Sequence, residues 1–186
     1  MNTHLKPFFY FENLKTWEKI IIGVYTAVTI TLCIWYFLTS IDVKKSILFF
    51  YGYGTSVLIY FALYTSLRNL TSYLIWFFFG LVQLTIYFLT IHNQSLIMAR
   101  GHASSGLKNT IILLVLFQFL RYKSLKLQHR EFVVPAKNSS KDLLENKNIT
   151  ATDYFILIIY IGTYVGLVFL SSVRWFLLSY LTNNSI

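Results

Sequence analysis

The stretch from Ile20 to Ser40 reads IIIGVYTAVTITLCIWYFLTS and contains no acidic or basic residue. About 20 apolar residues in an α-helix, each rising about 1.5 Å, match the roughly 30 Å hydrocarbon core of a bilayer. Four further apolar runs follow, at about 46–67, 72–91, 107–122 and 154–171. They are continuous and lack the alternation of apolar and polar residues that marks the strands of a membrane barrel. The sequence therefore predicts an all-α, polytopic membrane protein with five spans.

The overall composition agrees with membrane insertion. The 186 residues are 56% hydrophobic and only 12% charged, and the mean hydropathy is +0.58. A soluble domain of this size does not carry so much apolar surface. The formal net charge is +9, and in a membrane protein such an excess orients the chain and contacts anionic lipid head groups. We therefore expect a lipid bilayer with anionic head groups as a partner, and no nucleic acid.

The runs divide the chain into five parts. A polar and aromatic leader, residues 1–19, precedes the first span and is expected at the cytoplasmic interface, as part of an uncleaved signal anchor. Residues 20–120 hold the first four helices, and residues 121–153 form a basic cytoplasmic stalk and loop. Thr152 or Asp153 is expected to cap the fifth helix, residues 154–172. Residues 173–186 form a short tail.

The fourth run is the weakest of the five. Residues 107–122 include Lys108, Asn109, Gln118 and Arg121, so this helix is expected to be short, with a re-entrant segment and a four-span protein as alternatives. With five spans, eleven Lys and Arg residues lie on the side of the N-terminus and five on the other side. The excess of Lys and Arg in cytoplasmic segments then places the N-terminus in the cytoplasm. Without the fourth span the orientation inverts.

Two runs carry faces of small residues, where helix backbones can approach closely. In the fifth run, Gly162 and Gly166 form a Gly-xxx-Gly pair. The face in the second run contains Gly52, Thr55, Ser56, Ala62 and Ser66. Each face could pack within one protomer or form the seam of a homo-oligomer, and the pattern does not distinguish these uses.

Polar side chains at membrane depth and basic side chains at its edge are the remaining candidates. Gln83 and Gln118 are expected to hydrogen-bond other helices, and secondarily to line a pore. The basic cluster after the fourth run is expected to contact anionic lipid or an acidic, soluble cytoplasmic partner. Its members are Arg121, Lys123, Lys126 and Arg130, with the helix continuing beyond the membrane.

The connection from Ile91 to Lys108 contains His92, Arg100 and His102, together with two glycines. The histidines lack the spacing of a metal site and have no nearby carboxylate in the sequence. We therefore expect no metal here, and a solvated, flexible loop whose functional alternative is an exposed ligand or partner contact.

No nucleophile elbow, phosphate-binding loop, zinc-protease or Cys-x-x-Cys motif occurs in the chain. We expect no enzyme and no cofactor. The leading hypothesis is a membrane subunit for assembly or partner interaction, of the kind used in immunity or defence, in the bacterial inner membrane. A channel or transport subunit with a path lined by Gln83 and Thr85 is the alternative. A lipid-interface enzyme using His92 or His102 is the third hypothesis.

Overall fold

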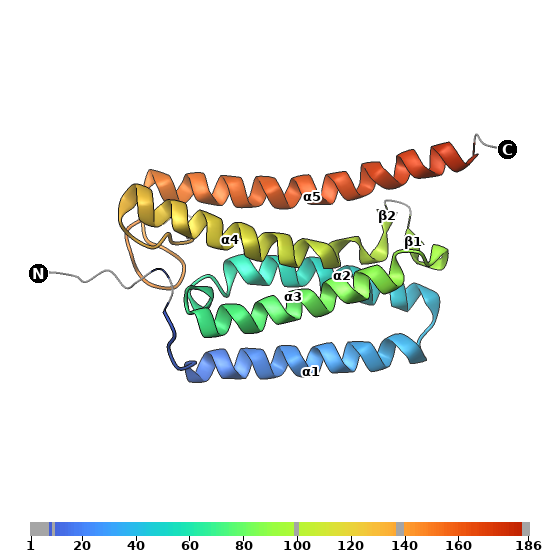
Figure 1. The fold of residues 1–186 in the computed structure, drawn as a ribbon, viewed down its shortest axis with the longest axis horizontal. Helices are drawn as coiled ribbons and strands as arrows, with labels where there is room; N and C mark the ends of the chain where they lie inside the picture. The colour runs from blue at the N-terminus through green and yellow to red at the C-terminus, as the bar shows by residue number, and fades with distance from the viewer. Residues whose placement is uncertain (1–7, 9, 99–100, 137–139, 184–186) are drawn as a thin grey trace, which may run out of the picture.

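The computed structural model describes residues 8, 10–98, 101–136 and 140–183, with only the backbone for 174–183. Five helices lie side by side and alternate in direction (Figure 1). They are α1 (Thr16–Leu38), α2 (Ile41–Phe61), α3 (Leu70–Thr90), α4 (Leu107–Gln128) and α5 (Ala151–Asn183). Short elements join them: 3-10 helices η1 (Ser66–Arg68), η2 (Gln94–Leu96) and η3 (Ala103–Gly106), and antiparallel strands β1 (Ile97–Met98) and β2 (Gly101–His102). The all-α fold is confirmed.

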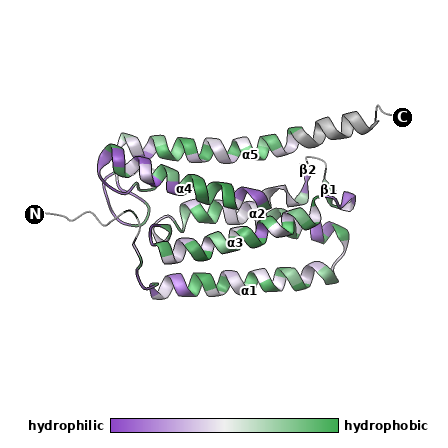
Figure 2. Ribbon diagram, in the orientation of Figure 1, coloured by the Kyte–Doolittle hydropathy of each residue, from purple (hydrophilic) through white to green (hydrophobic). Residues whose placement is uncertain are grey.

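The helices form a layered bundle. The outermost helix, α5, lies on α4, which packs against both α2 and α3, and α1 lies at the opposite edge (Figure 1). We call the end where α1 begins the leader end; it also holds the segments 62–69 and 129–150 (Figure 1). The hairpin end holds the α1–α2 turn and the segment 91–106. Hydrophilic residues gather at both ends of the bundle, beyond the apolar helix bodies (Figure 2).

Four helices are individually long and apolar enough to cross a bilayer: α1, α3, α4 extended by η3, and α5. The chain is therefore a multi-pass membrane protein. The fourth run, expected to be short or re-entrant, is instead a continuous helix of 22 residues that runs along the bundle. The remaining helix, α2, is not apolar enough by this criterion, because its 21 residues include Lys44, Lys45 and several tyrosines.

The bounds of two helices differ from the sequence prediction. The second run was expected to begin at about residue 46, but α2 begins at Ile41, where Asp42 in the first turn complements the helix dipole. That helix ends at Phe61, and the chain then passes through a turn into η1. The fifth helix begins at Ala151 and continues to Asn183, so it includes most of the expected tail.

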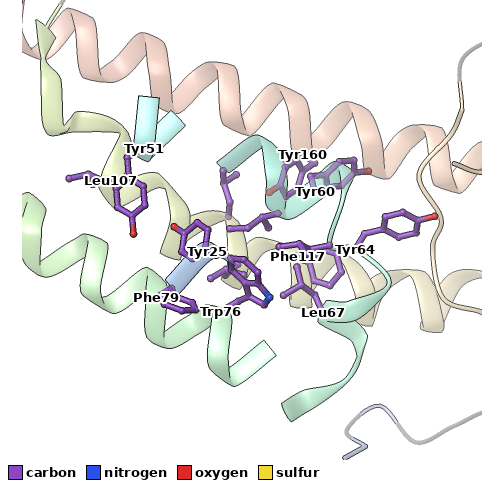
Figure 3. Packing of buried hydrophobic residues seen from close by; sticks show 14 of the residues in the cluster. Tyr25, Tyr51, Tyr60, Tyr64, Leu67, Trp76, Phe79, Leu107, Phe117 and Tyr160 are labelled. Atoms are coloured by element: carbon purple, nitrogen blue, oxygen red, sulfur yellow. The ribbon is translucent and has the colours of Figure 1, made fainter. Parts of the chain in front are cut away.

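Aromatic side chains fill the core. The Tyr25 ring lies 4.8 Å from Trp76 and 4.9 Å from Phe79, measured between ring centroids, which joins α1 to α3 (Figure 3). On the other side of α2, Tyr60 stacks on Tyr160 of α5 at 4.0 Å. Offset and edge-on ring pairs of this kind stabilise a fold beyond their buried area. The two clusters attach the outer helices, α1 and α5, to the central ones.

Candidate functional site

Gln83 forms a hydrogen-bonded node in the middle of the bundle. Its side chain is fully buried, and Nε2 donates to the Tyr25 hydroxyl at 2.8 Å and to Thr55 Oγ1 at 2.9 Å. The Gln83 Oε1 atom accepts a hydrogen bond from the Thr110 hydroxyl at 2.5 Å. One amide therefore joins α3 to α1, α2 and α4. The sequence-based expectation that Gln83 hydrogen-bonds other helices is confirmed. Thr85, the other residue of the proposed transport path, is exposed and donates to Leu81 of its own helix.

The leader is attached to the α2–α3 connection by backbone and side-chain hydrogen bonds. Leu70 N donates to the Tyr10 carbonyl at 3.0 Å. Asn69 donates to the Glu12 carbonyl at 2.8 Å, and Asn69 Oδ1 accepts from Glu12 N and from Thr71 N. Asn69 thus caps α3 and holds the leader with the same side chain. The leader is therefore held on the end of the bundle at Tyr10 and Glu12, within its described part.

The segment 129–150, expected as a cytoplasmic loop, also folds onto the leader end in its described parts, residues 129–136 and 140–150. Phe132 is fully buried, with its ring 5.2 Å from Phe117 of α4. Arg68 donates to the Phe132 carbonyl at 2.6 Å and pairs with Glu145 at 2.8 Å. The helix α4 continues past the predicted run, 107–122, to Gln128, and these contacts then turn the chain back on the bundle.

Two carboxyl groups in this segment are held in the ionised form. Burial by itself raises the pKa of Asp142, but hydrogen bonds from the Tyr64 hydroxyl and from backbone N–H groups outweigh it and lower the pKa. Burial also raises the pKa of Glu145, and the Arg68 guanidinium beside it produces a net lowering. In the charged form, both carboxylates hold the segment 129–150 more strongly against Tyr64 and Arg68.

The basic cluster divides into buried and exposed members. Arg121, expected to contact lipid or a partner, is buried, with Nε and Nη2 on the Glu131 carboxylate at 2.9 and 2.7 Å. The Phe8 ring lies 4.8 Å from its guanidinium. Arg130 lies beyond the helix and pairs with the fully buried Asp153 carboxylate. That prediction is therefore wrong for Arg121, while Lys123 and Lys126 remain exposed.

A polar recess of about 520 Å³ lies among these segments at the leader end. Its wall includes Arg68, whose Nε is buried without a hydrogen-bond partner in the described part of the chain. Four basic and four acidic side chains line it: Lys15, Arg68, Arg130 and Lys147, and Glu12, Glu18, Glu131 and Glu145. The balanced charge gives the recess no net attraction for ions of either sign.

The small-residue face of α2 is used inside the protomer. A Cβ atom added at Gly52 would lie 2.7 Å from the Gly106 carbonyl carbon and from Leu107 N. Ser56 is buried and donates to the Gly52 carbonyl at 3.0 Å. The prediction is wrong for Ala62 and Ser66, which lie beyond the last residue of α2. Ser66 instead bonds Ser72 at 2.6 Å.

Gly162 and Gly166 behave differently from Gly52. Among the described atoms, none lies within 4 Å of a Cβ built at either position, leaving aside chain neighbours and the backbone of α5 itself. The buried apolar residues described in α5, Ile156 and Tyr160, pack in the core of the bundle. Packing of the Gly-xxx-Gly pair within the protomer is therefore excluded for the described residues.

The connection expected to be a flexible loop is ordered in its described part. His102 is buried; it caps η3 by accepting from Ser104 N, and Nε2 lies 3.1 Å from the Asn93 carbonyl. Burial lowers its pKa, although the bond to Asn93 opposes the shift. Ser105 is buried beside it. No group of three metal-ligating side chains occurs among the residues described.

Other sequence candidates have local partners. Gln118 donates to the Leu67 carbonyl at 3.1 Å and receives a bond from Arg121. The cap of α5 is Thr150, because Thr150 N donates to Asp153 and Asp153 N donates back to the Thr150 hydroxyl. The prediction of Thr152 or Asp153 at the cap position is therefore wrong by two or three residues.

Fold and site together define a multi-pass α-helical membrane protein with a buried amide node and a folded polar end. Comparison with protein-family models, curated proteins and solved structures found no match.

Proposed function

We propose that this chain is a non-enzymatic subunit of a membrane assembly and that it associates through α5. The observation that carries the proposal is the open space beside Gly162 and Gly166. Glycine in a helix interior costs about 1 kcal/mol relative to alanine. No contact of the described protomer offsets that cost at these two positions, whereas close approach of another membrane helix does.

The attachment of α5 supports this assignment. Its buried side chains contact the bundle, whereas Phe155, Val165 and Phe169 are exposed. Lipid tails accept such side chains, so their exposure alone does not select a protein partner. A flat glycine stripe is different, because it offers lipid little side-chain surface and offers a second helix a short interaxial distance. The partner in this proposal is a second copy of the chain or another membrane protein.

The cellular setting is part of the same proposal. The proposed location is a bacterial inner membrane. The N-terminus and the leader end then lie in the cytoplasm, an orientation that the distribution of Lys and Arg favours. Lys123 and Lys126 then lie exposed at the cytoplasmic surface. There they are available to anionic head groups or to an acidic soluble protein, each contributing about 1 kcal/mol near an anionic leaflet. A small immunity or defence component fits this arrangement.

The test compares Gly166→Leu with Gly23→Leu in vesicles from the native host. Gly23 is the matched control because it lies in the other outer helix, α1, and an added Cβ there also meets open space. Crosslinking and size analysis should show a complex that Gly166→Leu weakens at least tenfold and Gly23→Leu preserves. A wild-type chain that stays monomeric and crosslinks to no membrane protein would refute the proposal. The composition of the complex distinguishes a second copy from a different partner.

A further inference from the structure

A lateral groove of about 330 Å³ opens at the hairpin end, between α1, α2 and α3. This volume lies in the range of small-molecule pockets. Its wall is mainly apolar and includes Leu32, Cys33, Ile47, Leu48, Ile86 and Leu89. The groove lies far along the bundle from the basic cluster and the polar recess, which are at the leader end.

The hydroxyl groups of Thr29, Tyr51 and Thr90 in the groove wall already have hydrogen-bond partners. Thr29 bonds the Tyr51 hydroxyl at 2.9 Å and donates to the Tyr25 carbonyl at 2.8 Å. Thr90 donates to the Ile86 carbonyl at 2.7 Å. A ligand with polar atoms inside the groove would leave them without partners, at a cost of about 1 to 3 kcal/mol each. The mainly apolar wall and these satisfied hydroxyl groups therefore favour hydrocarbon as the part of the occupant that enters the groove.

A cation lies at one end of this apolar wall. Lys44 Nζ is 5.2 Å from the centroid of the Tyr36 ring, and Tyr36 lines the groove. Lys44, Ile47 and Leu48 are three and four residues apart on α2, so they share one helix face. The nearby carboxylate of Asp42 is 89% exposed and lies 3.9 Å from Lys45. The first turn of α2 keeps a net positive charge with Lys44 beside the groove.

We propose that the groove binds one acyl chain of an acidic phospholipid, with the phosphate of the head group at Lys44. The observations favour this occupant because its two parts match the groove. The apolar wall fits the acyl chain, and the cation at the end of the wall fits the anionic head group. A cation that also contacts an aromatic ring is held in position for the phosphate. The site is separate from the α5 surface, so the inference does not depend on the proposed assembly.

The chain provides its own reporter, because its single cysteine, Cys33, is exposed in the wall of this groove. The experiment measures the rate of maleimide labelling of Cys33 in the purified full-length protein in detergent, while phosphatidylglycerol or phosphatidylcholine is added. Phosphatidylglycerol should slow labelling at least about fivefold, and native mass spectrometry should show one retained lipid. Phosphatidylcholine should act only at several-fold higher concentration.

Three variants make the test specific. Lys44→Ala should remove the preference for phosphatidylglycerol, Lys44→Arg should retain it, and Lys123→Ala, at the opposite end, should leave it unchanged. Equal protection by both lipids, or no protection, would refute the proposal. Protection that depends on protein concentration and not on lipid would show that a second copy covers the groove, which also refutes it.

Discussion

The strongest test of the fold is replacement of Gln83 by leucine. This change keeps a side chain of similar size at a fully buried position and removes both the amide donor and the amide acceptor. It therefore breaks the three bonds from Gln83 to Tyr25, Thr55 and Thr110 at once. Since these residues lie on three other helices, the variant tests whether one amide holds four helices together.

The expected loss follows from the number of bonds and from the partners left behind. An interhelical side-chain hydrogen bond in a membrane protein contributes about 0.6 kcal/mol on average and up to about 1.7. Tyr25 and Thr55 keep their mutual bond of 2.9 Å, so neither hydroxyl becomes an orphan. Thr110 loses its bond to the Gln83 amide. We expect Gln83→Leu to lower the free energy of unfolding by about 2 kcal/mol.

The assay is equilibrium unfolding in mixed micelles by increasing dodecyl sulfate, followed by far-ultraviolet circular dichroism. Thr85→Val is the matched control, because Thr85 lies on the same helix and donates only to the Leu81 carbonyl in the structure. It should change stability by no more than about 0.5 kcal/mol, as for other exposed positions. In a double-mutant cycle, Thr110→Val should cost less in the Gln83→Leu background than in the wild type. A Gln83→Leu protein as stable as the control would refute the node.

Three further predictions use the same unfolding assay. Gly52→Ala should lose about 1 to 3 kcal/mol, because the new Cβ meets backbone atoms at 2.7 Å, whereas Gly54→Ala, with open space at its Cβ, should be neutral or slightly stabilising. Glu131→Gln should cost about 3 kcal/mol by leaving the Arg121 charge buried without its counter-ion; a loss below about 1 kcal/mol would contradict that burial. The folded pKa of Asp142 lies below its unfolded value, so its contribution is full above about pH 4 and is lost as the pH falls through the folded pKa. Asp142→Asn should therefore flatten the acid limb of the stability profile, and an unchanged limb would contradict the assignment.

The helices and the role of Gln83 could be predicted because lipid leaves few alternatives. A long uncharged run in a bilayer must satisfy its backbone within one helix, so its approximate bounds can be read from the sequence. A glutamine in such a run finds its best partners on other helices. The choice of Tyr25, Thr55 and Thr110 required the packing, since Tyr and Thr hydroxyls occur throughout the apolar runs.

Arg121 could not be placed from the sequence, because its burial depends on two segments that have no regular pattern. Its carboxylate partner, Glu131, lies ten residues later in an irregular segment, and the ring over it, Phe8, belongs to the leader. The sequence-based prediction that every Lys and Arg of the basic cluster contacts lipid or a partner assumes that each of these cations is exposed. The assumption holds for Lys123. It fails for Arg121, because the loop after α4 folds back and supplies Glu131 as a counter-ion.

The glycine patterns show why spacing alone does not decide a contact. Gly52 and Gly166 each belong to a small-residue stripe, yet only Gly52 touches another element of the protomer. A signal was present for the ordered connection at the hairpin end: His102 and Ser104 have the spacing of a side chain that caps a turn two residues later. The contact of His102 Nε2 with the Asn93 carbonyl could not be predicted in this way, because only the fold brings that carbonyl near.

The ranking of the helices by apolar character has a physical basis in their burial. The two most apolar helices, α5 and α1, are the least buried, and α4, the least apolar of the four membrane-spanning candidates, is the most buried. A residue that faces lipid must be apolar, whereas a residue that faces another helix can be polar if it is hydrogen-bonded. The same reasoning applies to the central helix α2, whose buried polar residues, Thr55 and Ser56 among them, are hydrogen-bonded inside the bundle. The low hydropathy of α4 therefore marks a helix at the centre of the bundle, and the weak fourth run signalled burial where we expected a short span, with a re-entrant segment as the alternative.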